Sequence, residues 1–90
     1  MLKVSPSKRF SKDLQICIKR NYNLGLLAKV INTLMIPDKL PVSNKDHHLK
    51  GNYANWKECH IAPDWLLIYR VENDELVLER TGTHSDLFKK

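Results

Sequence analysis

The sequence predicts an α+β fold in which an N-terminal helical hairpin packs against an antiparallel sheet. Apolar residues recur at helical spacing between residues 8 and 35. Three short strand-like runs joined by tight turns then occupy residues 56–81. The chain has 90 residues, 42% of them hydrophobic, which suits one globular domain over residues 1–90. The predicted order of elements is β-α-α-β-β-β.

The first half of the chain contains a short strand and two helices. Residues 2–5 can form the strand, and Ser7 is placed to cap a helix whose apolar stripe contains Phe10, Leu14, Cys17 and Ile18. Asn23 is placed to cap a second helix, with apolar residues repeating from Leu24 to Met35. That helix must end before Pro37, because the proline ring prevents its continuation. The two helices therefore form a hairpin around residues 21–23.

The second half begins with a long irregular connection over residues 37–55 and continues as three strands. The expected strands are residues 56–61, 65–71 and 76–81, joined through residues 62–64 and 72–75. Both links have turn chemistry and are short, which favours antiparallel neighbours. The middle run is apolar on both faces and is expected to be central. Residues 85–88 are long enough only for a terminal turn.

Charge is distributed unevenly along the chain. Residues 1–57 hold eleven Lys or Arg and three acidic residues, net +8, whereas residues 58–90 hold four bases and seven acids, net −3. A basic face suits a polyanion or an acidic protein partner. We expect the basic helical face to bind RNA electrostatically; its residues are Lys8, Arg9, Lys12, Lys19 and Arg20. No apolar run is long enough to span a bilayer and the start lacks a leader's apolar stretch, so we expect a cytoplasmic chain without a membrane partner.

The candidate chemical residues lie in the long connection and at strand ends. His47 and His48 are in the connection, whereas His60 and His84 are near strand ends. Strand alternation predicts that Glu58 and His60 share a face, and that Arg80 shares a face with Leu76 and Leu78. The side chains that we expect to meet are His47, His60, Asp64, Arg80 and His84.

Such a group has the components of a metal-free ribonuclease. Imidazoles exchange protons near neutral pH, a carboxylate orients an imidazole or acts as a base, and a guanidinium grips phosphate. A zinc site is disfavoured because no His-x-His or His-x-x-x-His spacing occurs and Cys59 should point away from His60. No Gly-x-Ser-x-Gly motif or glycine-rich phosphate loop is present. We therefore expect neither a metal nor another cofactor.

Three separated blocks of the sequence resemble one toxin family. The blocks are residues 45–51 (KDHHLKG), 58–69 (ECHIAPDWLLIY) and 80–88 (RTGTHSDLF). In order and spacing they resemble the YafQ branch of the RelE/ParE toxin superfamily, and the resemblance covers residues 1–88. It implies two helices on an antiparallel sheet and a ribosome-dependent messenger-RNA endonuclease that uses no metal. It also implies an antitoxin protein as partner, with the ribosomal A site and mRNA as targets. The free toxin is expected to be a monomer.

The resemblance also assigns site residues by position. The active-site histidines fall on His47, His60 and His84, the acidic residue on Asp64, the phosphate-binding arginine on Arg80 and the C-terminal aromatic residue on Phe88, with Trp65 adjoining the site. Two positions depart from many relatives, which have proline at His48 and arginine at Lys57. Lysine keeps the charge but loses bidentate geometry. Neither residue is assigned to chemistry.

Two alternatives from other classes remain open at this stage. A toxin of the same fold could act without cleavage by gripping a protein such as a topoisomerase, as in the ParE branch, although that activity would not need these histidines. The chain could also be a non-catalytic RNA-binding module with a structural histidine cluster. The sequence does not choose the general base among His47, His60 and Asp64.

Overall fold

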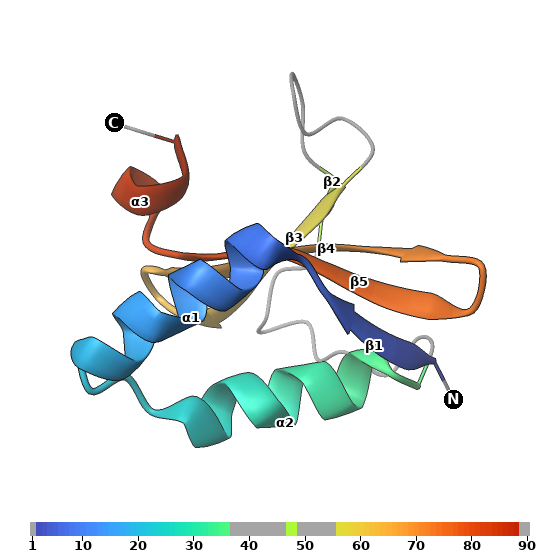
Figure 1. Ribbon diagram of the computed structural model, residues 1–90, viewed down its shortest axis with the longest axis horizontal. Coiled ribbons are helices and arrows are strands. Elements are labelled where there is room, and N and C mark those ends of the chain that lie inside the picture. The colour runs from blue at the N-terminus through green and yellow to red at the C-terminus, as the bar shows by residue number, and fades with distance from the viewer. Residues whose placement is uncertain (1, 37–46, 49–55, 89–90) are drawn as a thin grey trace.

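The computed structural model describes residues 2–36, 47–48 and 56–88 (Figure 1). Among these residues the elements are β1 (Lys3–Pro6), α1 (Lys8–Lys19), α2 (Leu24–Leu34), β2 (His47–His48), β3 (Lys57–Ala62), β4 (Trp65–Glu72), β5 (Glu75–Gly82) and α3 (His84–Phe88). The predicted α+β class and order of elements are confirmed. Two elements are additional: the expected terminal turn is a short helix, and β2 lies within the connection predicted to be irregular. The rest of that connection falls outside the described residues.

Both long helices begin at the capping residues that the sequence predicted, Ser7 and Asn23. The Ser7 hydroxyl accepts a hydrogen bond from the backbone N–H of Phe10 at 3.0 Å, and the Asn23 side chain accepts one from the N–H of Gly25 at 3.0 Å. Each cap satisfies one of the backbone donors that a helix start leaves without an intrahelical partner. The Ser7 hydroxyl also donates to the carbonyl of Glu79 at 2.8 Å, which ties the start of α1 to β5.

The five strands form one sheet in the order β1-β5-β4-β3-β2. β4 is central to β3 and β5, as predicted, and residues 65–69 of it are buried. The β4–β5 turn has Asn73 and Asp74 at φ values of 51° and 62°, the left-handed pair that a tight hairpin requires. One pairing differs from the expected antiparallel sheet: β1 runs parallel to β5, from Lys3 opposite Glu75 to Pro6 opposite Leu78. The whole helical hairpin and the rest of the sheet separate these two strands in sequence, so no local turn sets their relative direction.

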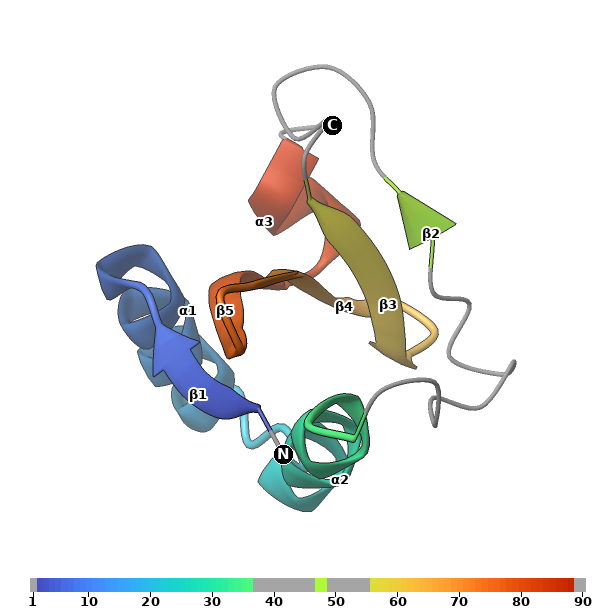
Figure 2. The same cartoon turned by 90° about the vertical axis from the view of Figure 1, so that its right-hand side faces the viewer.

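The sheet separates two apolar clusters. The larger contains Phe10, Cys17, Leu27, Val30, Leu34, Cys59, Ile61, Trp65, Leu67, Tyr69, Leu76 and Leu78, so it joins α1 and α2 to one face. The smaller contains Leu66, Ile68 and Leu87, with Trp56 and Phe88 against it, and places α3 on the other face. Figure 2 shows α3 and α2 on opposite sides of the central strands. The α3 face carries the candidate site.

A bulge in β5 changes which face Arg80 occupies. Ile68 pairs with Arg80, but the next residue, Tyr69, pairs with Leu78, so Glu79 is the extra residue. Strict alternation placed Arg80 with Leu76 and Leu78, and this expectation was wrong. The bulge puts Arg80 in register with Ile68 on the α3 face, while Leu78 remains in the larger cluster.

Within the described ranges, no helix combines the length and apolar character needed to cross a membrane.

Candidate active site

Two rows of side chains cross the α3 face of the sheet. In the first row Glu58 of β3 lies opposite Ile68 of β4, which lies opposite Arg80 of β5. In the second row His60 lies opposite Leu66, which lies opposite Gly82. Adjacent strands are about 4.8 Å apart, so Glu58 and Arg80 stand about 10 Å from each other across Ile68. The register thus places an acidic position and a basic position on either side of Ile68.

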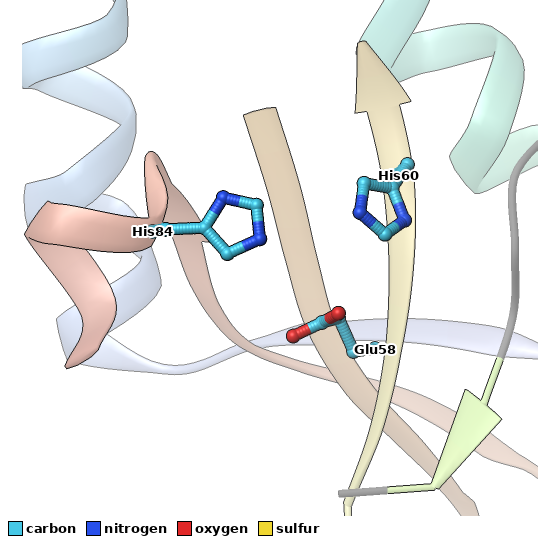
Figure 3. A group of neighbouring side chains, drawn as sticks. All are labelled: Glu58, His60 and His84. Atoms are coloured by element: carbon cyan, nitrogen blue, oxygen red, sulfur yellow. The ribbon is translucent and has the colours of Figure 1, made fainter. Parts of the chain in front are cut away.

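Glu58, His60 and His84 converge on this face of the sheet (Figure 3). One nitrogen or oxygen atom from each lies within 4.8 Å of the corresponding atoms of the other two. The rings of His60 and His84 have centroids 6.0 Å apart. Glu58 is buried, His60 is half-buried and His84 is exposed, so the group reaches from the sheet surface to solvent. A substrate atom can therefore approach from the His84 side.

Asp64 holds His84 by two hydrogen bonds to one carboxylate oxygen. The backbone N–H of His84 donates to Asp64 Oδ1 at 3.0 Å, and His84 Nδ1 lies 2.6 Å from the same oxygen. The backbone hydrogen bond, followed by the ring contact, lowers the pKa of Asp64 below its ordinary value. Asp64 is therefore ionised at neutral pH and can only accept hydrogen bonds.

This contact fixes the proton arrangement of His84. Because the carboxylate can only accept, the proton of the neutral ring lies on Nδ1. Nε2 is then the nitrogen that takes up and releases a proton, and it points toward His60 and Glu58 in Figure 3. An imidazole oriented through Nδ1 by a carboxylate, with Nε2 directed at the reacting atoms, is the arrangement used for general acid–base catalysis.

Arg80 is held by a carboxylate that the sequence reasoning missed. Its Nε and Nη2 donate to Asp13 at 2.8 and 2.9 Å, and the backbone N–H of Thr81 donates to the same carboxylate at 3.2 Å. Asp13 lies on α1 and is only 7% exposed. The fork-to-fork pair fixes the plane of the guanidinium and uses two of its five N–H donors.

Of the two aromatic residues expected at the site, Phe88 lies beside it and Trp65 is buried in the core. Phe88 packs on the smaller cluster, with its ring centroid 6.5 Å from that of His84, so it adjoins the site. Trp65 is 4% exposed in the larger cluster, where its indole N–H donates to the Thr81 hydroxyl at 2.9 Å. The structure therefore does not bring Trp65 to the surface where a substrate would lie.

The basic residues at the start of α1 are on the surface. Lys8, Arg9 and Lys12 are exposed, and Arg9 Nη1 is 3.6 Å from Glu79 Oε2. His47 is described only through its backbone, which pairs with Glu58 in the β2–β3 ladder. Its chain position is thus beside the acid of the site.

Glu58 is the acidic member that sequence reasoning placed on the His60 face but did not assign to the site. Two-residue alternation was the signal that could have selected it. Its burial could not be read from the sequence, because it depends on Leu66, Ile68 and α3 closing over the same face.

The same three side chains are the described residues that could hold a metal ion. A tetrahedral transition metal with bonds of about 2.0–2.1 Å needs donor atoms about 3.4 Å apart. Donors as far apart as 4.8 Å would have to move together by roughly 1 Å or more. Two imidazoles and one carboxylate are a donor set that suits zinc or copper.

Comparison with known proteins places the chain in a defined class. Residues 2–89 match the family described as "Bacterial toxin of type II toxin-antitoxin system, YafQ". The chain is 40% identical over 84 residues to the mRNA interferase toxin YafQ of Escherichia coli strain K12, covering 91% of this chain and 90% of that protein. The chain is thus a toxin of the type II toxin–antitoxin class.

Solved structures agree with that class. A copper-bound mutant toxin from Helicobacter pylori has 42% identity and a TM-score of 0.92, covering 98% of this chain and 100% of that one. The toxin in the E. coli DinJ–YafQ complex has 35% identity and a TM-score of 0.86, covering 98% and 99%. Within the type II class, the chain belongs to the YafQ family.

Proposed function

We propose that this chain is an endoribonuclease that cleaves messenger RNA at the ribosomal A site without a metal and so inhibits translation in the cytoplasm. The observation that carries the proposal is the Asp64–His84 pair, which leaves Nε2 of His84 directed at Glu58 and His60. The E. coli relative is named an mRNA interferase toxin, which supports RNA as the substrate.

The proposed reaction uses the ribose 2′-hydroxyl as the nucleophile. A base removes its proton, the 2′-oxygen bonds to phosphorus, and the bond from phosphorus to the 5′-oxygen breaks. His84 acts as the imidazolium, with a proton on each ring nitrogen: it gives the Nε2 proton to the leaving 5′-oxygen and keeps the Nδ1 proton on Asp64. Arg80, oriented by Asp13, stabilises the negative charge on the phosphorane. The products are a 2′,3′-cyclic phosphate and a 5′-hydroxyl.

The contacts of the site support three candidates for the general base. Asp64 is engaged by His84, which favours orientation rather than proton abstraction as its role. Glu58 and His60 are within reach of the same reacting atoms as His84, since their donor atoms lie within 4.8 Å of its own. We propose Glu58 or His60 first and His47 third, because only the backbone pairing of His47 with Glu58 is described.

The charge distribution supports the proposed partners. The exposed cations of α1 provide a surface for ribosomal RNA, separate from the histidines. The E. coli relative forms a complex with DinJ, and by analogy we expect an antitoxin to neutralise this chain. The free toxin is proposed to be a monomer that forms a hetero-oligomer with that antitoxin.

The test compares three reaction mixtures. Purified toxin is incubated with naked mRNA, with mRNA on translating ribosomes, and with relaxed DNA plus a supercoiling topoisomerase and ATP. His84→Ala is run in parallel. We expect wild-type toxin to cleave mRNA on ribosomes and His84→Ala to lose that activity. Blocked supercoiling without RNA cleavage would instead identify a topoisomerase inhibitor, and RNA binding alone would identify a non-catalytic module.

Metal binding is a second property that one observation favours. A copper-bound mutant toxin from H. pylori is similar to this chain, and Glu58, His60 and His84 form a suitable donor set. A metal on these atoms would occupy the nitrogen that His84 needs for proton transfer, so it should inhibit cleavage. We expect micromolar Cu²⁺ to abolish cleavage and a chelator to restore it. Loss of activity in the chelator alone would show that the metal is required and refute the metal-free reaction.

A further inference from the structure

α3 is too short to hold its own orientation. It has five residues, His84–Phe88, and a helix of about one turn is not stable in isolation. It nevertheless carries His84 and Phe88, and of its residues Leu87 alone is buried. The direction of the His84 ring must therefore be set by contacts from other elements.

Asp86 makes a second polar contact between α3 and the rest of the described fold, besides the contact of His84 with Asp64. Its Oδ2 accepts from Arg20 Nη1 at 2.6 Å, and its Oδ1 accepts from Arg20 Nη2 at 3.1 Å. Arg20 is the residue that ends α1, on the opposite side of the sheet. The pair therefore connects the two sides of the molecule at the end of the strands.

The same carboxylate also fixes the start of α3. Asp86 Oδ2 accepts from the backbone N–H of Thr83 at 3.0 Å, while the N–H of Asp86 donates to the Thr83 hydroxyl at 3.1 Å. This reciprocal pair is a capping box, which sets the direction in which a helix leaves the preceding chain. His84 is the first residue after Thr83, so the box acts directly on the catalytic imidazole.

Gly82 makes room for this arrangement. Its φ is +155°, and a Cβ at this position would lie 3.0 Å from both the Cβ and Oδ2 of Asp86. A contact of 3.0 Å is tighter than nine in ten that real Cβ atoms make, so Asp86 would have to shift by a few tenths of an ångström. Both this contact and the positive φ favour glycine as the last residue of β5.

Arg20 is in turn supported from the core. Its Nη1 donates to the Tyr22 hydroxyl at 3.3 Å, and the Tyr22 ring packs on Trp65 at a centroid distance of 4.9 Å. Trp65 donates to Thr81, beside Gly82. Buried Trp65 thus supports Arg20 through Tyr22, a role that needs no contact with RNA.

We propose that Arg20 and Asp86 are positioning residues for the RNA cleavage reaction, which hold α3 so that His84 points at Glu58 and His60. We call the group formed by Arg20, Thr83 and Asp86 the α3 latch. The inference rests on the proposed endoribonuclease function for its kinetic consequence, but the latch itself is independent of that function. Arg20 thus belongs to the latch and not to the RNA-binding cations of α1.

The latch predicts a loss of rate with little loss of binding. Misplacing a catalytic group by about 1 Å can cost up to about 10²-fold in rate. Arg20→Ala and Asp86→Asn should each lower the single-turnover cleavage rate at saturating ribosomes by about 10- to 100-fold. The dissociation constant for ribosomes should change less than about threefold, because the exposed cations of α1 remain.

The variants are chosen to separate the parts of the latch. Asp86→Asn keeps an oxygen that can accept from Thr83 but loses the ion pair, and Arg20→Lys keeps the charge without the fork and should retain part of the rate. The double variant should be no slower than the worse single variant, because both remove one interaction. Glu72→Ala is the matched control, since it breaks the 2.8 Å pair with Arg70 in the β4–β5 hairpin and should not change the rate.

A measurement without RNA tests the latch directly. In chelator-treated protein, ¹⁵N NMR should show the Nδ1–H tautomer of His84 in wild type and a mixture of tautomers in Arg20→Ala. The amide of Leu87, which donates to the Thr83 carbonyl at 3.1 Å, should exchange faster in the same variant. Unchanged tautomer and exchange in a folded variant, or a loss confined to ribosome affinity, would overturn the proposal. If wild type cleaves no RNA, the proposed function fails while these NMR measurements still decide the latch.

Discussion

At the scale of single residues, the site depends on carboxylates that each orient a cation or an imidazole. Asp64 holds His84, Asp13 holds Arg80 and Asp86 holds Arg20. In each pair the carboxylate comes from a distant part of the chain, 20, 67 and 66 residues away respectively. In each pair the carboxylate restricts the rotamers of the imidazole or guanidinium that it binds, so the reacting groups are preorganised.

Glu58 should matter to the chemistry more than its position in the sequence suggested. We expect Glu58→Gln to lower the cleavage rate by about 10²- to 10⁴-fold if it is the general base. Glutamine preserves the size of the buried side chain, so the thermal midpoint should change little. The same substitution logic applied to His60, as His60→Gln, distinguishes the two candidates in single-turnover assays. A full rate in Glu58→Gln would remove Glu58 from proton transfer.

Replacement of Arg80 should reduce stability as well as activity. Arg80→Ala leaves the Asp13 carboxylate, 7% exposed, without its fork-shaped partner. Breaking a buried ion pair from one side costs about 3 kcal/mol or more, so urea unfolding should show a clear loss. The double variant Asp13→Asn with Arg80→Ala should recover part of that loss while remaining inactive. Equal stability of the two variants would contradict a buried pair.

At the scale of elements, α1 has two separate tasks. Its buried positions Phe10 and Cys17 pack on the sheet, and its end supplies Arg20 to α3. Its exposed cations face solvent at the other end of the helix. Capping residues and apolar period were enough to predict α1 and α2, because these signals are local in sequence.

The cations at the start of α1 should act through binding. Changing Lys8 and Lys12 to Glu removes two positive charges from an exposed face. The slope of log affinity against log salt should become shallower by about 1 to 2, since fewer counterions are released from RNA. Cleavage at saturating ribosomes should stay within a few-fold of wild type. A collapse of that saturated rate would mean that the face contributes to catalysis.

The attachment of α3 should weaken in acid. The ion pair with Arg20, followed by the hydrogen bonds from Thr83, holds the pKa of Asp86 well below its ordinary value of 3.8. A lowered folded-state pKa means that the stabilising contribution is present above about pH 4 and fades as the pH falls toward the folded-state value. The difference in Tm between wild type and Asp86→Asn should therefore be largest near pH 7 and shrink below about pH 4. A difference that grows on acidification would contradict this assignment.

At the scale of the whole molecule, the sequence predicted the parts better than their long-range contacts. The α+β class, both long helices and the three C-terminal strands follow from apolar period and turn chemistry. The parallel pairing of β1 with β5 could not be predicted in this way, because it joins chain segments about 70 residues apart. The bulge at Glu79 could not be predicted either, because it depends on a single inserted residue. The bulge sets the register in which Arg80 pairs with Ile68.

The candidate site was predictable to a similar extent. Alternation and the family resemblance identified His60, Asp64 and His84, which the structure brings together with Glu58. Burial of Trp65 and the pairing of Asp13 with Arg80 arise from packing of α1 on β5, which no local pattern encodes. The side chain of His47 lies outside the described residues, so its assignment stays a prediction.

In the proposed reaction the 2′-hydroxyl attacks the phosphate, and this chain's own side chains remove its proton and protonate the leaving 5′-oxygen. The most direct test is to cleave a defined mRNA on ribosomes, in the presence of a transition-metal chelator that leaves the Mg²⁺ of the ribosome bound, and to identify both new ends by mass spectrometry. We predict a 5′-hydroxyl opposite a 2′,3′-cyclic phosphate, or opposite the 3′-phosphate formed by its hydrolysis. A 5′-phosphate with a 3′-hydroxyl would show that water or a metal-bound hydroxide was the nucleophile, and would contradict the account.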